Sequence, residues 1–108
     1  MPLYMTQFAY SPEAWTALTK NPENRTAAIQ ALGQKLGCRV ESVYYAFGDY
    51  DGFVIFEAPD ETTVTAFAVA ALEPGHIRAL KTTVLLRPEA VVDAMKKAAA
   101  VAYQGPRK

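Results

Sequence analysis

The order in which strand-like and helix-like segments follow one another limits the fold of this chain most. Residues 3–10 (LYMTQFAY) have the aromatic and apolar content of a strand and end at Ser11-Pro12-Glu13. A serine N-cap, a proline at the first helical position and an acid in the first turn together predict a helix start. A second start at Asn21-Pro22-Glu23 divides the helical stretch that Gly37 ends into two pieces. The chain therefore opens as a strand followed by two short helices.

Two strands and a tight turn are predicted next. Residues 38–47 and 53–57 are dense in Val, Ile, Tyr and Phe, and the loop between them, residues 48–52, ends in Asp-Gly, a strong hairpin signal. Asp60 is the predicted N-cap of the helix that follows these strands, and this helix ends at Pro74-Gly75.

The remainder of the chain predicts one more strand and one more helix. Residues 76–86 read as the fourth strand, and a helix runs from Pro88 to about Tyr103. The order predicts an α+β, ferredoxin-like βαββαβ fold with an extra C-terminal helix. Right-handed crossovers give a four-stranded antiparallel sheet of order 4-1-3-2 with helices on one face. We expect a single domain over residues 1–103 and a polar tail over 104–108.

Both faces of the hairpin strands are apolar. Phe53 and Ile55 alternate with Val54 and Phe56. The preceding strand alternates in the same way, which under regular pairing places Val43, Tyr45 and Phe47 on one face and Val40 and Tyr44 on the other. A sheet face in water is normally polar, and 51% hydrophobic residues is high for a chain of 108. We therefore expect a homodimer or higher homo-oligomer formed through the open sheet face, because the C-terminal helix is too short to cover it.

Charge, cysteine and histidine content exclude several classes of protein. Eleven Lys and Arg balance eleven Asp and Glu, which argues against dedicated binding to nucleic acid or to an anionic membrane. Cys38 is the single cysteine, so no intramolecular disulfide forms, and the absence of a signal-like N-terminus favours a cytoplasmic location. With His76 as the single histidine, we expect neither a metal site nor a cofactor.

Three turns are predicted to meet at one end of the sheet. They are the Tyr10-Ser11-Pro12 turn, the loop at residues 48–52 and the Pro74-Gly75-His76 turn. A site, if the domain has one, is expected at this polar and aromatic end.

The candidate site residues come from these turns and from the strands beside them. The predicted ligand-binding residues are Tyr45, Asp49, Tyr50, Asp51, His76 and Arg78. Asp51 and His76 are the candidates for general acid or base catalysis. Arg78 shares the strand face of His76 if pairing is regular, which would suit a small carboxylate or enolate. Arg25, on an otherwise apolar helix stripe, indicates a paired or ligand-facing guanidinium, or one that extends into solvent.

Each candidate also has a purely structural interpretation. Asp and Gly are what a tight hairpin requires, and His76 can simply form hydrogen bonds at a strand start. Arg78 can pair with a hairpin aspartate or with the partner subunit, and Tyr45 can pack in the core with its hydroxyl satisfied.

Several segments together resemble the GYD domain family of small bacterial proteins over residues 3–95. They are residues 4–8, 20–25, 44–47, 48–51, 57–60 and 75–78. The family usually has Glu at the position of Asp49 and a smaller residue or Asn at that of His76, so it implies no histidine chemistry. The resemblance implies a ferredoxin-like chain of the dimeric α/β-barrel type, without an established reaction.

Three functions are compatible with these observations. The first is a small-molecule-binding protein of the dimeric α/β-barrel type that takes a small organic ligand. The second is a cofactor-independent monooxygenase or isomerase that uses Tyr45, Asp51, His76 and Arg78 as polar groups. The third is a structural oligomerisation module whose hairpin end only joins subunits. Distant relatives with the dimeric α/β-barrel architecture include monooxygenases, isomerases, haem enzymes and ligand sensors. The shared architecture therefore does not decide between the three functions.

Overall fold

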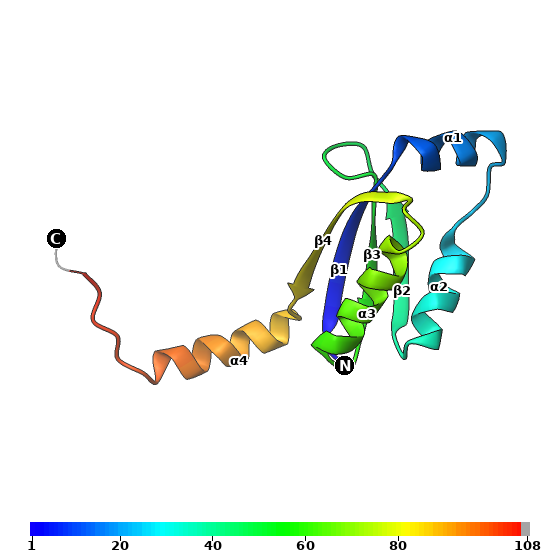
Figure 1. Cartoon of the computed structure of the whole chain (residues 1–108). Coiled ribbons are helices and arrows are strands. Elements are labelled where there is room, and N and C mark those ends of the chain that lie inside the picture. Colours follow the sequence, from blue (N-terminus) through cyan, green and yellow to red (C-terminus); the bar gives the residue numbers. More distant parts are fainter. Residues whose placement is uncertain (107–108) are drawn as a thin grey trace.

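The computed structural model describes residues 1–106, and its centre is a four-stranded antiparallel sheet (Figure 1). The strands are β1 (Leu3–Tyr10), β2 (Arg39–Tyr45), β3 (Gly52–Glu57) and β4 (Ile77–Leu85). Their order is β2-β3-β1-β4, which is the predicted 4-1-3-2 read from the other edge. The ferredoxin-like βαββαβ arrangement is thereby confirmed.

Three of the helices begin where the sequence predicted them. The helices are α1 (Pro12–Lys20), α2 (Thr26–Lys35), α3 (Glu61–Leu72) and α4 (Pro88–Ala99). Ser11 Oγ accepts a hydrogen bond from Ala14 N at 3.2 Å, and Asp60 Oδ1 accepts one from Thr63 N at 2.8 Å. These two contacts satisfy backbone donors that a first helical turn leaves free.

Two helix ends differ from the expectation. Helix α2 starts at Thr26, three residues beyond the predicted start at Glu23. Asn24 Oδ1 accepts a hydrogen bond from Thr26 N at 2.9 Å there, because the helix begins only after this turn. Helix α4 ends at Ala99 instead of about Tyr103. Its last turn is fully exposed, and a short helix without packing gains too little to continue. The predicted polar tail falls partly on residues 107–108, which lie outside the described part.

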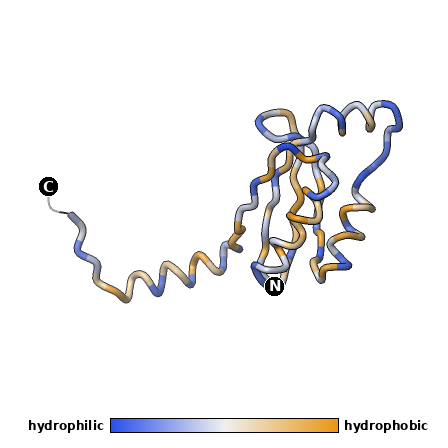
Figure 2. The backbone as a smooth tube through the Cα atoms, in the orientation of Figure 1, coloured by the Kyte–Doolittle hydropathy of each residue, from blue (hydrophilic) through white to orange (hydrophobic). Residues whose placement is uncertain are grey.

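The core lies between one sheet face and the helices α1–α3. Phe56 is 1% exposed, and its ring centroid lies 5.7 Å from that of Tyr4 and 5.0 Å from that of Phe67 on α3. Val54 and Phe8 continue this buried face along the strands. In Figure 2 the hydrophobic colour follows α3 and the strands behind it.

A register shift in β2 changes which side chains share a face. Val40 pairs with Phe56 and Val43 pairs with Val54, so both valines lie on the helix-covered face. The extra residue between Val40 and Ser42 breaks the simple alternation. The prediction that Val40 shares a face with Tyr44 is therefore wrong.

The opposite sheet face carries a row of incompletely covered apolar side chains. The register places Met5 next to Ile55, and Phe53 next to Tyr44, on the face that turns away from α1–α3. Tyr44 is 60% exposed, and its ring centroid lies 5.7 Å from that of Phe53. With Leu3 they form the surface that we call the open sheet face. Its centre is apolar, as the sequence predicted.

Helix α4 leaves the body of the molecule at the end of β4 and points away from it (Figure 1). All of its residues are exposed except Val91, which is half-buried. The radius of gyration, 17.9 Å, exceeds the roughly 13 Å typical of a globular domain of about 100 residues. Within residues 1–106, no helix is long and apolar enough to cross a lipid bilayer.

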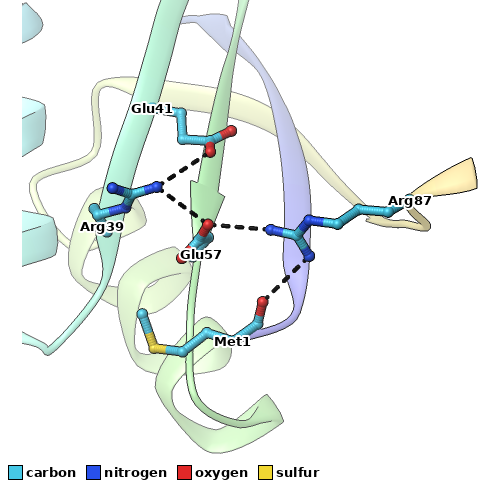
Figure 3. Close-up of polar contacts among 5 residues, drawn as sticks. All are labelled: Met1, Arg39, Glu41, Glu57 and Arg87. Atoms are coloured by element: carbon cyan, nitrogen blue, oxygen red, sulfur yellow. Dashed lines mark hydrogen bonds and ion pairs between the residues drawn. The ribbon is translucent and has the colours of Figure 1, made fainter. Parts of the chain in front are cut away.

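An ion-pair network fixes the chain just before α4. Glu57 Oε1 lies 3.2 Å from Arg39 Nη2 and 3.1 Å from Arg87 Nη2 (Figure 3). Arg87 Nη1 also donates to the carbonyl of Met1 at 3.5 Å. The network thus joins β2, β3, the N-terminus and the residue that precedes α4.

Candidate functional site

Backbone hydrogen bonds hold the three predicted turns together at one end of the sheet. Ser11 N donates to His76 O at 2.8 Å, which joins the start of α1 to the start of β4. Asp51 N donates to Phe8 O at 2.8 Å, which joins the β2–β3 loop to β1. The predicted convergence of these turns is confirmed.

Asp51 ties the hairpin to the junction between β1 and α1. Its Oδ2 accepts hydrogen bonds from Tyr10 N at 2.8 Å and from Trp15 Nε1 at 3.2 Å. Its carbonyl oxygen accepts a third bond, from Ala46 N at 2.8 Å. One carboxylate therefore orients both the end of β1 and the first turns of α1.

Four aromatic side chains pack together beside Asp51. The ring centroid of Tyr10 lies 5.2 Å from those of Phe8 and Trp15, and 6.2 Å from that of Tyr45. The hydroxyl oxygens of Tyr10 and Tyr45 are 3.1 Å apart and share a hydrogen bond. Burial, followed by this hydrogen bond, raises the pKa of Tyr10 well above its ordinary value. Tyr10 therefore stays a neutral phenol at physiological pH.

A cavity of about 490 Å³ lies between the helix-covered sheet face and helices α1–α3. Phe8, Val54, Phe56 and Leu80 line it from the sheet. The helices contribute six alanines, namely Ala14, Ala17, Ala28, Ala68, Ala70 and Ala71, and four larger apolar side chains, namely Leu18, Ile29, Leu32 and Phe67. Alanine extends one carbon from the helix, so these positions leave space that larger side chains would fill. The volume falls within the usual range of small-molecule sites, roughly 300–1,000 Å³.

The polar groups that line the cavity come mainly from its α1 end. They are Thr6, Tyr10, Glu23, Arg25 and His76. Arg25 Nη1 lies 2.7 Å from Glu23 Oε1, in an ion pair whose side chains are 41% and 54% exposed. The positive charge of Arg25 acts to lower the pKa of Tyr10, against the larger effect of burial. The guanidinium and the phenol therefore line the same cavity, close enough for the charge of Arg25 to act on Tyr10.

The six predicted site residues occupy different positions around this cavity. His76 is the one of the six that lines it, and Tyr45 reaches it through the hydroxyl of Tyr10. Asp51 supports the cavity wall through Tyr10 N. In the β2–β3 loop, Asp49 is exposed and Tyr50 is half-buried, and neither lines the cavity.

Arg78 is separated from His76 by an irregular strand pairing. Tyr10 pairs with Ile77 and Ala9 pairs with Ala79, so Arg78 is an extra residue in β4. The regular pairing on which a shared His76–Arg78 face depended is therefore absent at this point. Arg78 is exposed and lies outside the cavity lining.

Sequence reasoning missed several of the polar lining residues. Tyr10 ends β1 on the inward face, and Thr6 is the polar exception between Tyr4 and Phe8 on that face. The sequence signal that could have found Thr6 is its position as a polar residue within an otherwise apolar strand face. Arg25 had been singled out as a lone charge on an apolar helix stripe, and the structure places it at the cavity.

Within residues 1–106, no group of three or more His, Cys, Asp or Glu side chains is arranged to hold a metal ion. The cavity offers aromatic and aliphatic surface, one arginine–glutamate pair, the phenol hydroxyl of Tyr10, the hydroxyl of Thr6 and the imidazole of His76. This set suits binding of an organic molecule with a limited polar part.

Comparisons with known proteins give a family and a fold. A model of the GYD domain family matches residues 4–95. No curated protein matches the sequence. The crystal structure of MtbAldR superposes with a TM-score of 0.59 at 21% identity, over 80% of this chain and 53% of that one. The chain thus spans about half the length of MtbAldR.

Two further crystal structures are similar at lower scores. An antibiotic biosynthesis monooxygenase gives a TM-score of 0.49 at 15% identity, over 81% of this chain and 98% of that one. A hypothetical protein from Pyrococcus horikoshii gives 0.47 at 16% identity, over 81% and 92%. At 21% identity, the similarity to MtbAldR shows a shared fold and not a shared activity.

Proposed function

The chain belongs to the GYD domain family, and we propose that this member binds a small, largely apolar organic molecule in the cavity between the sheet and helices α1–α3. The observation that carries the proposal is the 490 Å³ cavity itself, which is lined by aromatic and aliphatic side chains of the sheet and by alanines and larger apolar side chains of the helices. An apolar molecule that fills such a space gains about 25 cal/mol for each Å² of apolar surface removed from water.

The construction of the cavity supports binding in preference to simple loose packing. Helix α3 is apolar enough to pack closely, yet it places Ala68 and Ala71 toward the space above Val54 and Leu80. Glu23, Ala28 and His76 in the lining are exposed, so the space opens to solvent there and a ligand can enter it. The hydrogen bonds of Asp51 and Ser11 hold its α1 end in place without a ligand.

The proposal can be tested with the neutral fluorescent probe N-phenyl-1-naphthylamine. We expect saturable binding to the wild-type protein and strongly reduced binding to Ala71→Leu, whose larger side chain enters the cavity. Ala90→Leu, at an exposed position on α4, is the matched control and should bind as the wild type does. Circular dichroism checks that each variant is folded. Equal probe binding by the wild type and Ala71→Leu would refute the cavity as the site.

We also propose that the open sheet face packs against a second copy of the chain. Phe53, Ile55 and Met5 form an apolar centre there, which would otherwise remain partly in contact with water. Two copies related by a two-fold axis bury the same face on each partner, which is the commonest form of self-association.

Sedimentation equilibrium measures this association directly. We expect the wild type to exceed the 11.8 kDa of one chain, and Ile55→Lys to sediment as a single chain because a charge in the interface centre is costly. Val69→Lys replaces a 57% exposed valine on the outer side of α3 and should leave the mass unchanged. A wild-type protein of 11.8 kDa at micromolar concentration would contradict the proposal.

A further inference from the structure

The charged groups of the cavity are few and lie together. Among the described residues that line it, Arg25 is the single Lys or Arg, and Glu23 is the single Asp or Glu. The remaining polar groups at this end are the hydroxyl of Tyr10 and the imidazole of His76. A ligand that enters the cavity therefore meets one fixed positive charge and one fixed negative charge.

The pair between Arg25 and Glu23 is weak enough to be replaced. Both side chains are about half exposed, and ion pairs of this kind contribute little to stability because solvent screens them. Glu23 contacts Nη1, while a guanidinium has five N–H donors in a planar fork. Such a fork binds a carboxylate through two parallel hydrogen bonds when one approaches in its plane.

A second donor, the hydroxyl of Tyr10, lines the same cavity. Tyr10 and Tyr45 have two hydroxyl protons between them, and their mutual hydrogen bond uses one. When Tyr45 donates to Tyr10, the hydroxyl proton of Tyr10 is available to an acceptor in the cavity that Tyr10 lines. Because Tyr10 remains protonated, the pair can donate to an anion without repelling it. Helix α2 also begins directly after Arg25, which places the positive end of its dipole near the same point.

We propose that the ligand is an apolar carboxylic acid whose carboxylate binds Arg25 and the Tyr10–Tyr45 hydroxyl pair, with its apolar part against Phe8 and Val54. This inference rests on the proposed function, since it needs the cavity to bind a small molecule. It adds the chemical class of that molecule and the residue that recognises it. Glu23 then lowers the affinity for the ligand, because its carboxylate competes with that of the ligand for Arg25.

The two members of the ion pair give opposite predictions for one ligand. Octanoate and 1-octanol have the same apolar chain, and each is used to displace bound N-phenyl-1-naphthylamine. The measured quantity is the affinity for octanoate divided by the affinity for 1-octanol. In Arg25→Gln this ratio should be about tenfold lower than in the wild type, because charge-assisted hydrogen bonds to the carboxylate are lost. Glu23→Gln should bind octanoate about threefold more tightly, and its affinity for 1-octanol should not change.

The outcomes separate this inference from the proposed function. If the ratio of octanoate to octanol affinity is the same in the wild type and both variants, the carboxylate assignment is wrong, while blocking of the probe by Ala71→Leu still supports the cavity. If the wild type binds neither the probe nor octanoate, both proposals fail. Because Glu23 and Arg25 lie in an exposed connection between α1 and α2, both variants are expected to fold.

Discussion

One carboxylate oxygen of Asp51 accepts a hydrogen bond from the backbone N–H of Tyr10 at 2.8 Å. The same oxygen accepts a second bond from Trp15 Nε1 at 3.2 Å. The hairpin aspartate that the sequence marked as a catalytic candidate thus holds the last residue of β1 and the first turns of α1. Since Tyr10 lines the cavity, Asp51 acts on the site as a positioning residue.

Removal of the Asp51 carboxylate should destabilise the fold. In Asp51→Ala the N–H of Tyr10, a residue 8% exposed, loses its partner, and an unsatisfied buried donor costs about 1–3 kcal/mol. Asp51→Asn retains an oxygen that can accept from Tyr10 N and Trp15 Nε1, so its loss should be smaller. Urea denaturation measures the free energy of unfolding for both. Equal stability of Asp51→Ala and the wild type would contradict the assigned role.

Local signals made the elements predictable, whereas side-chain placement at the site depends on strand pairing. Ser11 and Asp60 cap helices through contacts within three residues, so the sequence alone locates them. The extra residue at Arg78 arises from how β4 pairs with β1, and nothing near it in the sequence indicates a bulge. That single irregularity separates His76, which lines the cavity, from Arg78, which does not.

The cavity follows from the relative placement of α1, α2 and α3. Alanines such as Ala28 and Ala71 are ordinary helix residues in the sequence, because alanine has the highest helix propensity. They become significant when the helices place them opposite Val54 and Leu80. The end of the sheet that holds the site was predictable from the three turns, and the lining of the cavity required the tertiary structure.

The raised pKa of Tyr10 predicts a loss of stability in alkali. An unfolded tyrosine ionises near pH ~10, whereas folded Tyr10 holds its proton to higher pH, so the unfolded state binds fewer protons there. The stability that the protonated Tyr10 contributes is fully present below pH ~10, and it is lost as the pH rises toward the pKa of Tyr10 in the folded protein. The stability difference between the wild type and Tyr10→Phe should shrink by up to ~1.4 kcal/mol per pH unit above pH ~10. Urea denaturation from pH 8 to 11 measures it, and a constant difference would contradict the prediction.

Gly52 is required by close packing at the start of β3. A Cβ atom at this position would lie 2.6 Å from Phe8 Cζ and 2.8 Å from the carbonyl oxygen of Tyr44. Gly52→Ala should therefore lower the free energy of unfolding by about 1–3 kcal/mol, the usual cost of overpacking. Gly48→Ala is the control, since its Cβ would meet nothing within 4 Å. Thermal unfolding compares the two, and an equal effect would show that Phe8 moves aside without cost.

The two glutamates beside Arg39 should differ in their contribution to stability. The Glu57 side chain is 15% exposed and contacts both Arg39 and Arg87, while that of Glu41 is 37% exposed and contacts Arg39 alone, at 3.4 Å (Figure 3). Glu57→Gln leaves two arginines close together without their shared counter-ion, and we expect a loss of about 1–2 kcal/mol.

Glu41→Gln, the matched control for Glu57→Gln, should remain within about 0.5 kcal/mol of the wild type, as exposed pairs usually do. Urea denaturation at low and at high salt measures how much of each loss in the free energy of unfolding comes from exposed charges, because salt screens them. The gap between the two variants should persist at high salt, since Glu57 is largely shielded by the strands around it. If the gap disappears at high salt, the network acts as an ordinary surface pair and does not fix Arg87 at the start of α4.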